Sequence, residues 1–300
     1  MLHAVLKMHI TKRRDRSMNV ENIVKSIDAL APLSDAILDI QKLYSAGQEE
    51  LDINKLISFI ESDSLLSLNI LKMANSPIYG FSTRIASVSQ AVTLFGIMQV
   101  YGFVMKYAVS ENIKAKTEIF GFSNERFNDI CNIQSALLLQ WYSKIDLEDA
   151  RFLAPLALIM ETGKLVIANE VSVTSYEKEF EEGFRKSKDS NNYEKLLIGT
   201  TSYELSSMVF KHWHLEPLYI RILKELQEKD EASETLRKYI QILNIVLSAV
   251  NLKSILSKAS VLKACTQVKE MGLNPNAFAK VALNVKRAYI SELKVRQEKS

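Results

Sequence analysis

Residues 61–99 read ESDSLLSLNILKMANSPIYGFSTRIASVSQAVTLFGIMQ and carry the most specific pattern in the chain. Two stretches with helical apolar spacing flank a short connector, Asn75-Ser76-Pro77-Ile78-Tyr79-Gly80. Pro77 lacks a backbone N–H and disfavours helical geometry at the residue before it, so the first helix must end near Asn75. Gly80 permits a backbone turn that other residues resist. The stretch therefore predicts a helix, a rigid polar connector and a second helix.

Capping residues mark the starts of both helices. Ser62 or Asp63 can accept hydrogen bonds from the free amides of the first helix. Ser87 and Gln90, three residues apart, form a capping-box pattern that opens the second helix. The apolar side of the first helix is predicted to consist of Leu65, Leu68, Ile70, Leu71 and Met73.

The same stretch resembles the HDOD family, a bacterial signalling module distantly related to the HD metal-dependent phosphohydrolases. The residues that carry the resemblance are Asp63, Leu71–Gly80, Ile85, Ser87, Gln90, Ala91 and Leu94–Gly96, with Leu30–Ser34, Ile37 and Leu38 upstream. The resemblance covers residues 20–225, of which Ala74–Gly80 is the specific part. It implies an all-α bundle of two lobes, the second an HD-like helical core.

Composition agrees with a helical, soluble protein. Of 300 residues, 47% are hydrophobic and 24% charged, and nine Gly and five Pro are few for a turn-rich β architecture. Val171–Thr174 could be extended but is too short to define a sheet. The sequence has no uncharged apolar run of about 18 residues, so no membrane span is predicted. Cys131 and Cys265 belong to no metal or redox spacing, which predicts a reduced, cytoplasmic protein.

Four regions are expected along the chain. They are a basic N-terminal extension (1–18), an N-terminal helical lobe (19–120), a degenerate HD-like lobe (121–230), and C-terminal helices that pack on the module (231–300). A hinge is expected at 118–124. The predicted helices cover 20–29, 34–46, 52–61, 63–75, 87–110, 125–143, 148–170, 193–199, 202–212, 216–228, 233–252, 253–270 and 275–297, with part of 175–194 also helical.

The resemblance also indicates where a metal would be held in an HD phosphohydrolase. Such enzymes use one early His, an adjacent His-Asp pair and later ligands, because divalent cations accept nitrogen and oxygen donors. In the matching segment Leu158–Val166, Met160 and Glu161 occupy the positions of the pair. Ile130 or Cys131 occupies the position of the first His, and Ser202 that of a later one. A tandem-His position is replaced by Ile222–Glu225, so the resemblance implies a site without its metal ligands.

The four histidines of the chain do not replace these ligands. His3 and His9 lie in the N-terminal extension. His212 and His214 flank Trp213 two positions apart, so their side chains point in different directions and cannot chelate one ion together. No phosphate-binding glycine loop, nucleophile elbow or zinc motif is present. Cys131 lies on an apolar helix face and is expected to be a buried, inert thiol. We therefore expect no catalytic residues and no cofactor.

The leading hypothesis is a non-catalytic signalling and regulatory scaffold that acts through protein–protein contacts. The resemblance implies partners in bacterial signalling or motility. Candidate partner-binding residues are the polar and aromatic members of the connector region: Asn75, Ser76, Tyr79 and Arg84. A structural explanation competes on equal terms, because Asn75 could cap the helix and Tyr79 could plug an interface between lobes.

Three further hypotheses remain, and one of them, a ligand-sensing cleft between the lobes, is not decided by the residues alone. A residual phosphohydrolase acting on nucleotides or cyclic dinucleotides would need a substitute site from Glu161, Glu204, Asp129 and His212. A nucleic-acid contact could use residues 251–300, where ten Lys/Arg against three Glu give a local charge of +7. A solvated basic helix face is the commoner explanation of such a bias, so nucleic acid is not the favoured partner.

Overall fold

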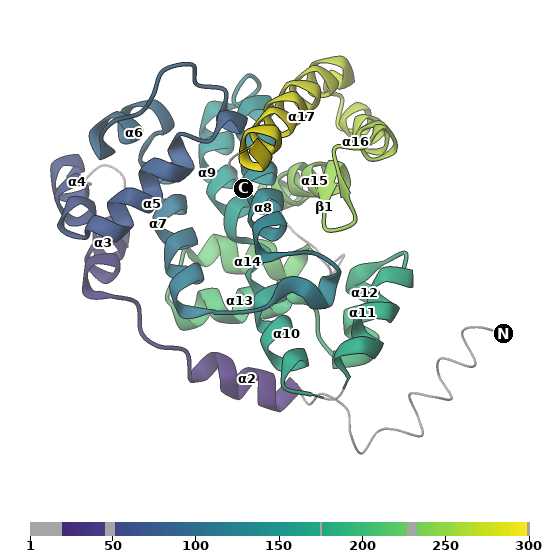
Figure 1. Ribbon diagram of the computed structural model, residues 1–300. Helices are drawn as coiled ribbons and strands as arrows, with labels where there is room; N and C mark the ends of the chain where they lie inside the picture. Colours follow the sequence, from purple (N-terminus) through teal and green to yellow (C-terminus); the bar gives the residue numbers. More distant parts are fainter. Residues whose placement is uncertain (1–19, 46–51, 175, 227–232, 299–300) are drawn as a thin grey trace. The chain divides into compact units, whose positions relative to one another are not determined.

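The computed structural model describes residues 20–45, 52–174, 176–226 and 233–298, and α-helix accounts for nearly all of their regular structure (Figure 1). The predicted all-α class is confirmed. The described chain divides into two compact units that interleave along the sequence. Unit 1 takes the segment ending at Ala31, Ile113–Asn124 and Glu161–Lys224. Unit 2 takes Pro32–Asn112, Glu125–Met160 and the residues from Glu225 onward.

Unit 1 is built from short helices. Its elements are α2 (Val20–Asp28), the 3-10 turn η3 (Thr117–Phe120), α10 (Thr162–Ser172), α11 (Glu177–Lys186), α12 (Ser190–Ile198), α13 (Ser202–His212) and α14 (Pro217–Glu225), whose last residue falls at the unit boundary.

Unit 2 contains the longer helices and a small hairpin. Its elements are α3 (Asp35–Ser45), α4 (Ile53–Ser62), α5 (Ser64–Ala74), the 3-10 turn η2 (Pro77–Tyr79), α6 (Val88–Phe95), α7 (Ile97–Asn112), α8 (Asn124–Tyr142), α9 (Leu147–Ile159), α15 (Glu234–Ala249), β1 (Val250–Asn251), β2 (Ser254–Ile255), α16 (Lys258–Glu270) and α17 (Pro275–Glu298).

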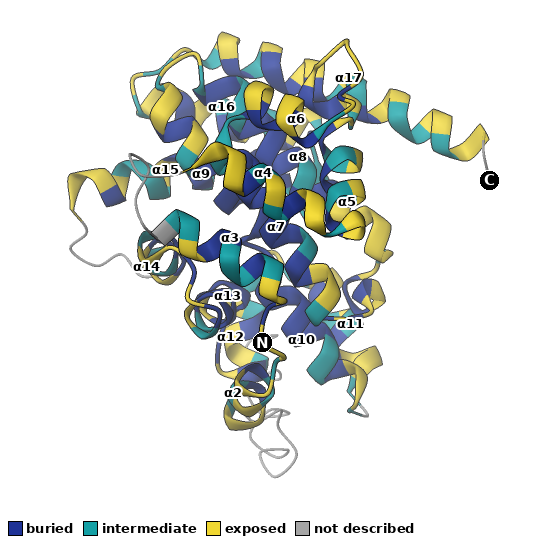
Figure 2. Cartoon of the chain, turned by 90° about the vertical axis from the view of Figure 1, so that its left-hand side faces the viewer, coloured by how far each residue is buried: buried dark blue, intermediate teal, exposed yellow. Residues whose placement is uncertain are grey.

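The core of unit 2 forms around α7, which is buried on most of its surface (Figure 2). Gly102 on α7 packs against Pro155 on α9 so closely that an added Cβ would lie 2.8 Å from the proline Cβ. Tyr79, Phe95 and Phe103 form an edge-to-face cluster with ring centroids 5.0–5.6 Å apart. Elements from the connector, α6 and α7 therefore share one aromatic core.

Four predicted helices differ clearly from the structure in their bounds. The helix expected at 87–110 is two helices, because Gly96 has a φ of +79° that the right-handed helix cannot contain. The helix expected at 148–170 ends at Ile159 and a new one begins at Thr162. The predicted helices 233–252 and 253–270 meet at residues that instead form a short antiparallel hairpin. In this hairpin Val250 pairs with Ile255, and Asn251 pairs with Ser254. Val171 and Ser172 end α10 and are not extended.

The predicted apolar side of α5 was partly wrong. Leu65 and Leu68 are each 63% exposed, whereas Leu66, Ile70 and Ala74 are buried. The buried residues are spaced four apart and therefore lie on one face of the helix. Apolar residues surround this helix on several sides, so spacing alone did not identify the inner face.

The other expected regions have different outcomes. The two units interleave, whereas the expected lobes were contiguous; the region boundaries and the hinge at 118–124 stay predictions. The N-terminal extension, with His3 and His9, lies outside the described residues. Among the described residues, the segment Leu147–Ser172, which comprises α9 and α10, has the length and composition of a membrane span, but 89% of its apolar window is buried inside the protein. That burial is typical of a core segment.

The connector after α5 is closed by its first residue, Asn75. The Asn75 Nδ2 group donates to the carbonyl oxygens of Leu71 and Ile85, each at 2.8 Å, and its Oδ1 accepts from the Ile85 N–H at 2.8 Å. Ser76 is extended and Gly80 has a φ of +80°, as the sequence predicts. Asn75 therefore joins the end of α5 to Ile85, which lies beyond the connector.

The predicted caps on either side of this connector are present. Asp63 accepts from the N–H groups of Leu65 and Leu66, at 2.9 and 3.0 Å. Ser87 accepts from the Gln90 N–H at 3.1 Å. Gln90 reaches back to the Ala86 N–H at 2.7 Å, one residue before the position that a capping box uses. Local sequence therefore determines where α5 and α6 begin.

Replacement of Asn75 tests this role. Asn75→Ala removes three hydrogen bonds and leaves the Ile85 amide without its acceptor, so we expect the free energy of unfolding to fall by about 2 kcal/mol. Urea denaturation followed by circular dichroism measures the change. Asn69→Ala is the control, because Asn69 lies on the same helix and makes one exposed bond, to the Leu65 carbonyl. Equal losses for the two variants would contradict the assigned role.

Candidate functional site

The buried ammonium group of Lys164 occupies the centre of the HD-like position in unit 1. Lys164 lies on α10, and its Nζ donates to Glu194 Oε1 on α12 and to Ser202 Oγ on α13, each at 2.7 Å. Only 3% of Lys164 and none of Glu194 is exposed. Buried charges persist only when they are paired and hydrogen-bonded, and this pair meets both conditions.

A close approach of two helices positions these groups. An added Cβ on Gly163 would lie 1.8 Å from the Ser202 carbonyl oxygen, so only glycine allows α10 to lie this near α13. The Gly163 N–H donates to Ser206 Oγ at 2.7 Å, and that hydroxyl donates to the Ser202 carbonyl at 2.9 Å. Gly163 therefore has a packing role and Lys164 an electrostatic one.

Further groups complete the surroundings of the ammonium. Glu194 Oε2 accepts from the Ser202 N–H at 2.8 Å. Glu161 is buried, with its Oε2 3.9 Å from Lys164 Nζ and its Oε1 accepting from the Tyr203 hydroxyl at 3.4 Å. The rings of Phe120 and Tyr203 each have their centroid 5.9 Å from the ammonium. Lys164 thus has two carboxylates, a hydroxyl and two aromatic rings around it.

These residues do not fit the divalent metal that the HD resemblance implies. The carboxylates that a metal would need, Glu161 and Glu194, already face a fixed positive charge. Ser202 uses its hydroxyl as an acceptor for that charge. Among the described residues, no three His, Cys, Asp or Glu side chains gather in a way that could hold an ion.

The other positions matched to metal ligands carry apolar side chains. Ile130 and Met160 belong to unit 2, and both side chains are fully buried. Cys131 is a buried free thiol. None of these three offers a hard oxygen or nitrogen donor, so unit 2 supplies no ligand at the matched positions.

The residues proposed for a substitute site have other contacts. Glu204 accepts from the Thr200 hydroxyl at 2.7 Å, and a ring nitrogen of His212 lies 3.3 Å from the Leu30 carbonyl oxygen. Asp129 in unit 2 binds the Arg296 guanidinium at 3.0 and 3.1 Å. Burial raises the pKa of Asp129, and the bonds from Arg296 oppose that rise.

The connector candidates differ in how much surface they offer. Tyr79 is buried in the aromatic core, and the polar groups of Asn75 are used inside the connector. Ser76 Oγ donates to Glu292 Oε2 on α17 at 2.9 Å. Arg84 is exposed. The geometry favours the structural explanation for Asn75 and Tyr79, and partner binding by any of the four stays a prediction.

Helix α17 contacts the start of the connector at Ser76, and the sequence did not indicate this contact. Glu292 binds both Ser76 and Arg296, and Arg296 binds Asp129 and Glu125 near the start of α8. The partners are separated by up to 216 positions in the chain. No local pattern could have linked them.

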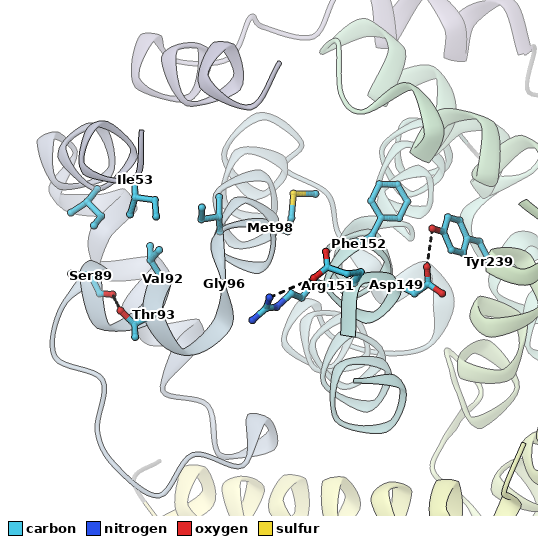
Figure 3. Close-up of a pocket in the computed structure, with 13 residues that line it drawn as sticks. Ile53, Ser89, Val92, Thr93, Gly96, Met98, Asp149, Arg151, Phe152 and Tyr239 are labelled. Atoms are coloured by element: carbon cyan, nitrogen blue, oxygen red, sulfur yellow. Dashed lines mark hydrogen bonds and ion pairs between the residues drawn. The ribbon is translucent and has the colours of Figure 1, made fainter. Parts of the chain in front are cut away.

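Unit 2 also contains a pocket of about 560 Å³ (Figure 3). Its walls come from α4, α6, the start of α7, α9 and α15, and the polar side chains include Ser89, Arg151 and Tyr239. The Tyr239 hydroxyl donates to Asp149 Oδ1 at 2.9 Å. Burial, and then the nearby Asp149 carboxylate, raise the pKa of the Tyr239 phenol to about 12. No sequence motif marked this pocket.

Removal of the Lys164 charge tests the buried pair. Lys164→Met leaves Glu194 and Glu161 buried without their cation, so we expect a loss of about 3–5 kcal/mol in the free energy of unfolding. The double variant Lys164→Met/Glu194→Gln removes charges of both signs and should recover part of that loss. Lys195→Ala, at an exposed position on α12, is the control. Urea denaturation of the wild type, these three variants and the single variant Glu194→Gln checks this, and additive losses for the two single variants would contradict the pairing.

Solved structures share this fold. A virulence factor from Campylobacter jejuni subsp. jejuni is 23% identical, with a TM-score of 0.53 over 87% of this chain and 98% of that one. An HDOD domain protein of unknown function from Geobacter sulfurreducens is 14% identical, with a TM-score of 0.61 over 90% and 94%. A protein of Marinobacter aquaeolei VT8, provisionally named as a signal transduction protein, is 17% identical, with a TM-score of 0.66 over 92% and 64%.

Sequence comparison gives the family directly. No curated protein matched the chain by sequence. The model of the HDOD domain matches residues 30–228, which include the connector and the Gly163-Lys164 segment. The family model covers about two thirds of the chain, and the helical fold agrees with it. The chain therefore belongs to the HDOD domain family.

Proposed function

We propose that this chain is a non-catalytic, cytoplasmic HDOD scaffold that relays or integrates a signal through protein–protein contacts. The observation that carries the proposal is the Lys164 ammonium, which is bonded to Glu194 and lies 3.9 Å from Glu161. Glu161, which stands at a matched metal-ligand position, and Glu194 thus already face a cation of the protein's own. The regulatory role and bacterial partners follow from the family resemblance.

Electrostatics supports the loss of metal-dependent chemistry. Two unit charges 4 Å apart interact by about 4 kcal/mol at an effective dielectric constant of 20, so Lys164 alone would repel a divalent ion at that distance by about 8 kcal/mol. The two carboxylates that would attract such an ion are already paired with Lys164. Apolar Ile130 and Met160 offer nothing to offset this cost. Metal activation of water, which HD hydrolysis needs, therefore has no support in the side chains present.

The competing function is a residual metal-dependent phosphohydrolase acting on nucleotides or cyclic dinucleotides. We expect purified full-length protein incubated with Mn²⁺ to retain less than one equivalent of metal and to release no product from phosphodiester substrates. Metal analysis and turnover assays measure the two quantities. Stoichiometric metal, together with activity that Glu161→Ala abolishes, would establish the enzyme and overturn the scaffold proposal.

Exposed Arg84 tests whether partners meet the connector. We expect Arg84→Glu to keep the thermal midpoint of the wild type, because the side chain is exposed, and to lose partners that the wild type captures from its native host. Lys263→Glu is the matched control, since it reverses an exposed charge on α16, away from the connector. Quantitative affinity capture compares the three proteins. Unchanged capture by Arg84→Glu would exclude this residue as a contact.

A further inference from the structure

The outward side of α17 carries a regular row of basic and aliphatic side chains. The row consists of Lys280, Leu283, Arg287, Ile290 and Lys294, which we call the α17 seam. All five are exposed, Leu283 by 47% and Ile290 by 43%. Helix α17 lies outside the residues that match the HDOD model, and exposed residues follow its length in Figure 2.

Spacing makes the seam continuous. Its members are three and four residues apart in alternation, which is the spacing of the a and d positions in a coiled coil. The seam spans about 21 Å, from a rise of 1.5 Å per residue. A helix laid along α17 would meet every member of the row.

The opposite side of α17 is already used. Phe278, Val281, Ala282, Val285 and Tyr289 are buried, and the Phe278 ring lies 4.9 Å from that of Trp141. The inner side therefore holds α17 on unit 2. The seam faces away from these contacts and is a second, separate face of the same helix.

The cations of the seam form no ion pair with any described carboxylate. In the part of the chain that the structure describes, neither Lys280, Arg287 nor Lys294 lies within 4 Å of a carboxylate. By contrast, Arg296 on another side of α17 binds three carboxylates. The seam thus presents three unmatched positive charges with two aliphatic side chains between them.

We propose that the α17 seam binds an acidic amphipathic helix of a partner protein. Leucines on that helix would cover Leu283 and Ile290, and its carboxylates would pair with Lys280, Arg287 and Lys294. This proposal extends the scaffold function to a surface outside the family region. The seam proposal can fail while the prediction that the protein turns over no phosphodiester still holds.

Other occupants fit the seam less well. A membrane-surface helix needs a wide apolar face with basic flanks, whereas here both kinds of residue share one narrow row. Nucleic acid would neutralise the cations but leave the aliphatic side chains in water. A second copy of the seam would bring positive charges near positive charges. Charge and apolar spacing together select the acidic helix.

The test uses a labelled synthetic peptide of about four heptads, with leucine at the a and d positions and glutamate beside them. We expect the full chain to bind it, as measured by fluorescence anisotropy. Leu283→Asp and Arg287→Glu should each weaken binding about tenfold or more, since each removes a contact along the row. Leu262→Asp is the control, because Leu262 is a 67% exposed leucine on α16. Its affinity should stay within about twofold of the wild type.

Four results would overturn the proposal. The peptide could fail to bind, or a version with lysine in place of glutamate could bind equally well. Double-stranded DNA or anionic vesicles could bind in a manner that Arg287→Glu abolishes and Leu283→Asp does not, which would assign the seam to phosphates. The chain alone could form a dimer that Ile290→Asp dissociates, as measured by sedimentation, which would assign the seam to a second copy.

Discussion

The packing of α10 on α13 in unit 1 depends on one buried ammonium, that of Lys164, which lies between two carboxylates. Removing charges from water costs several kcal/mol for each ion, and this cost is met here by short bonds from Lys164 to Glu194 and Ser202. Those bonds need α10 close to α13, which needs the absence of a side chain at Gly163. The helix packing and the polar cluster therefore require each other. The carboxylates of this cluster are engaged by the protein's own cation.

Much of the fold was predictable from short-range chemistry. Asp63, Ser87, Pro77 and Gly80 act on their own neighbours, so the limits of the connector followed from the sequence. Partners far along the chain were not predictable, as the bond between Ser76 and Glu292 shows. The outward position of Leu65 and Leu68 was also missed, because helix α5 is apolar on more than one side.

The contents of the candidate site were not predictable from the sequence, and the loss of its metal ligands stays a prediction from the family resemblance. Met160, Glu161 and Ser202 stand at positions that the family resemblance assigns to metal ligands, and the structure places no histidine there. The burial of Lys164 was not foreseen, because lysine is ordinarily exposed and pattern alone gives no reason to place it inside. The pocket beside Arg151 and Tyr239 was missed as well, because its walls come from five separate helices.

The contact between α17 and the connector has a consequence for folding during synthesis. Unit 2 draws on residues from Pro32 to the last described turns of α17, including Phe278 against Trp141 and Glu292 against Ser76. A domain completes its core only after all its segments have left the ribosome. The connector and α8 are therefore synthesised long before the helix that covers them. Until α17 emerges, the nascent protein must keep an unfinished apolar surface in solution.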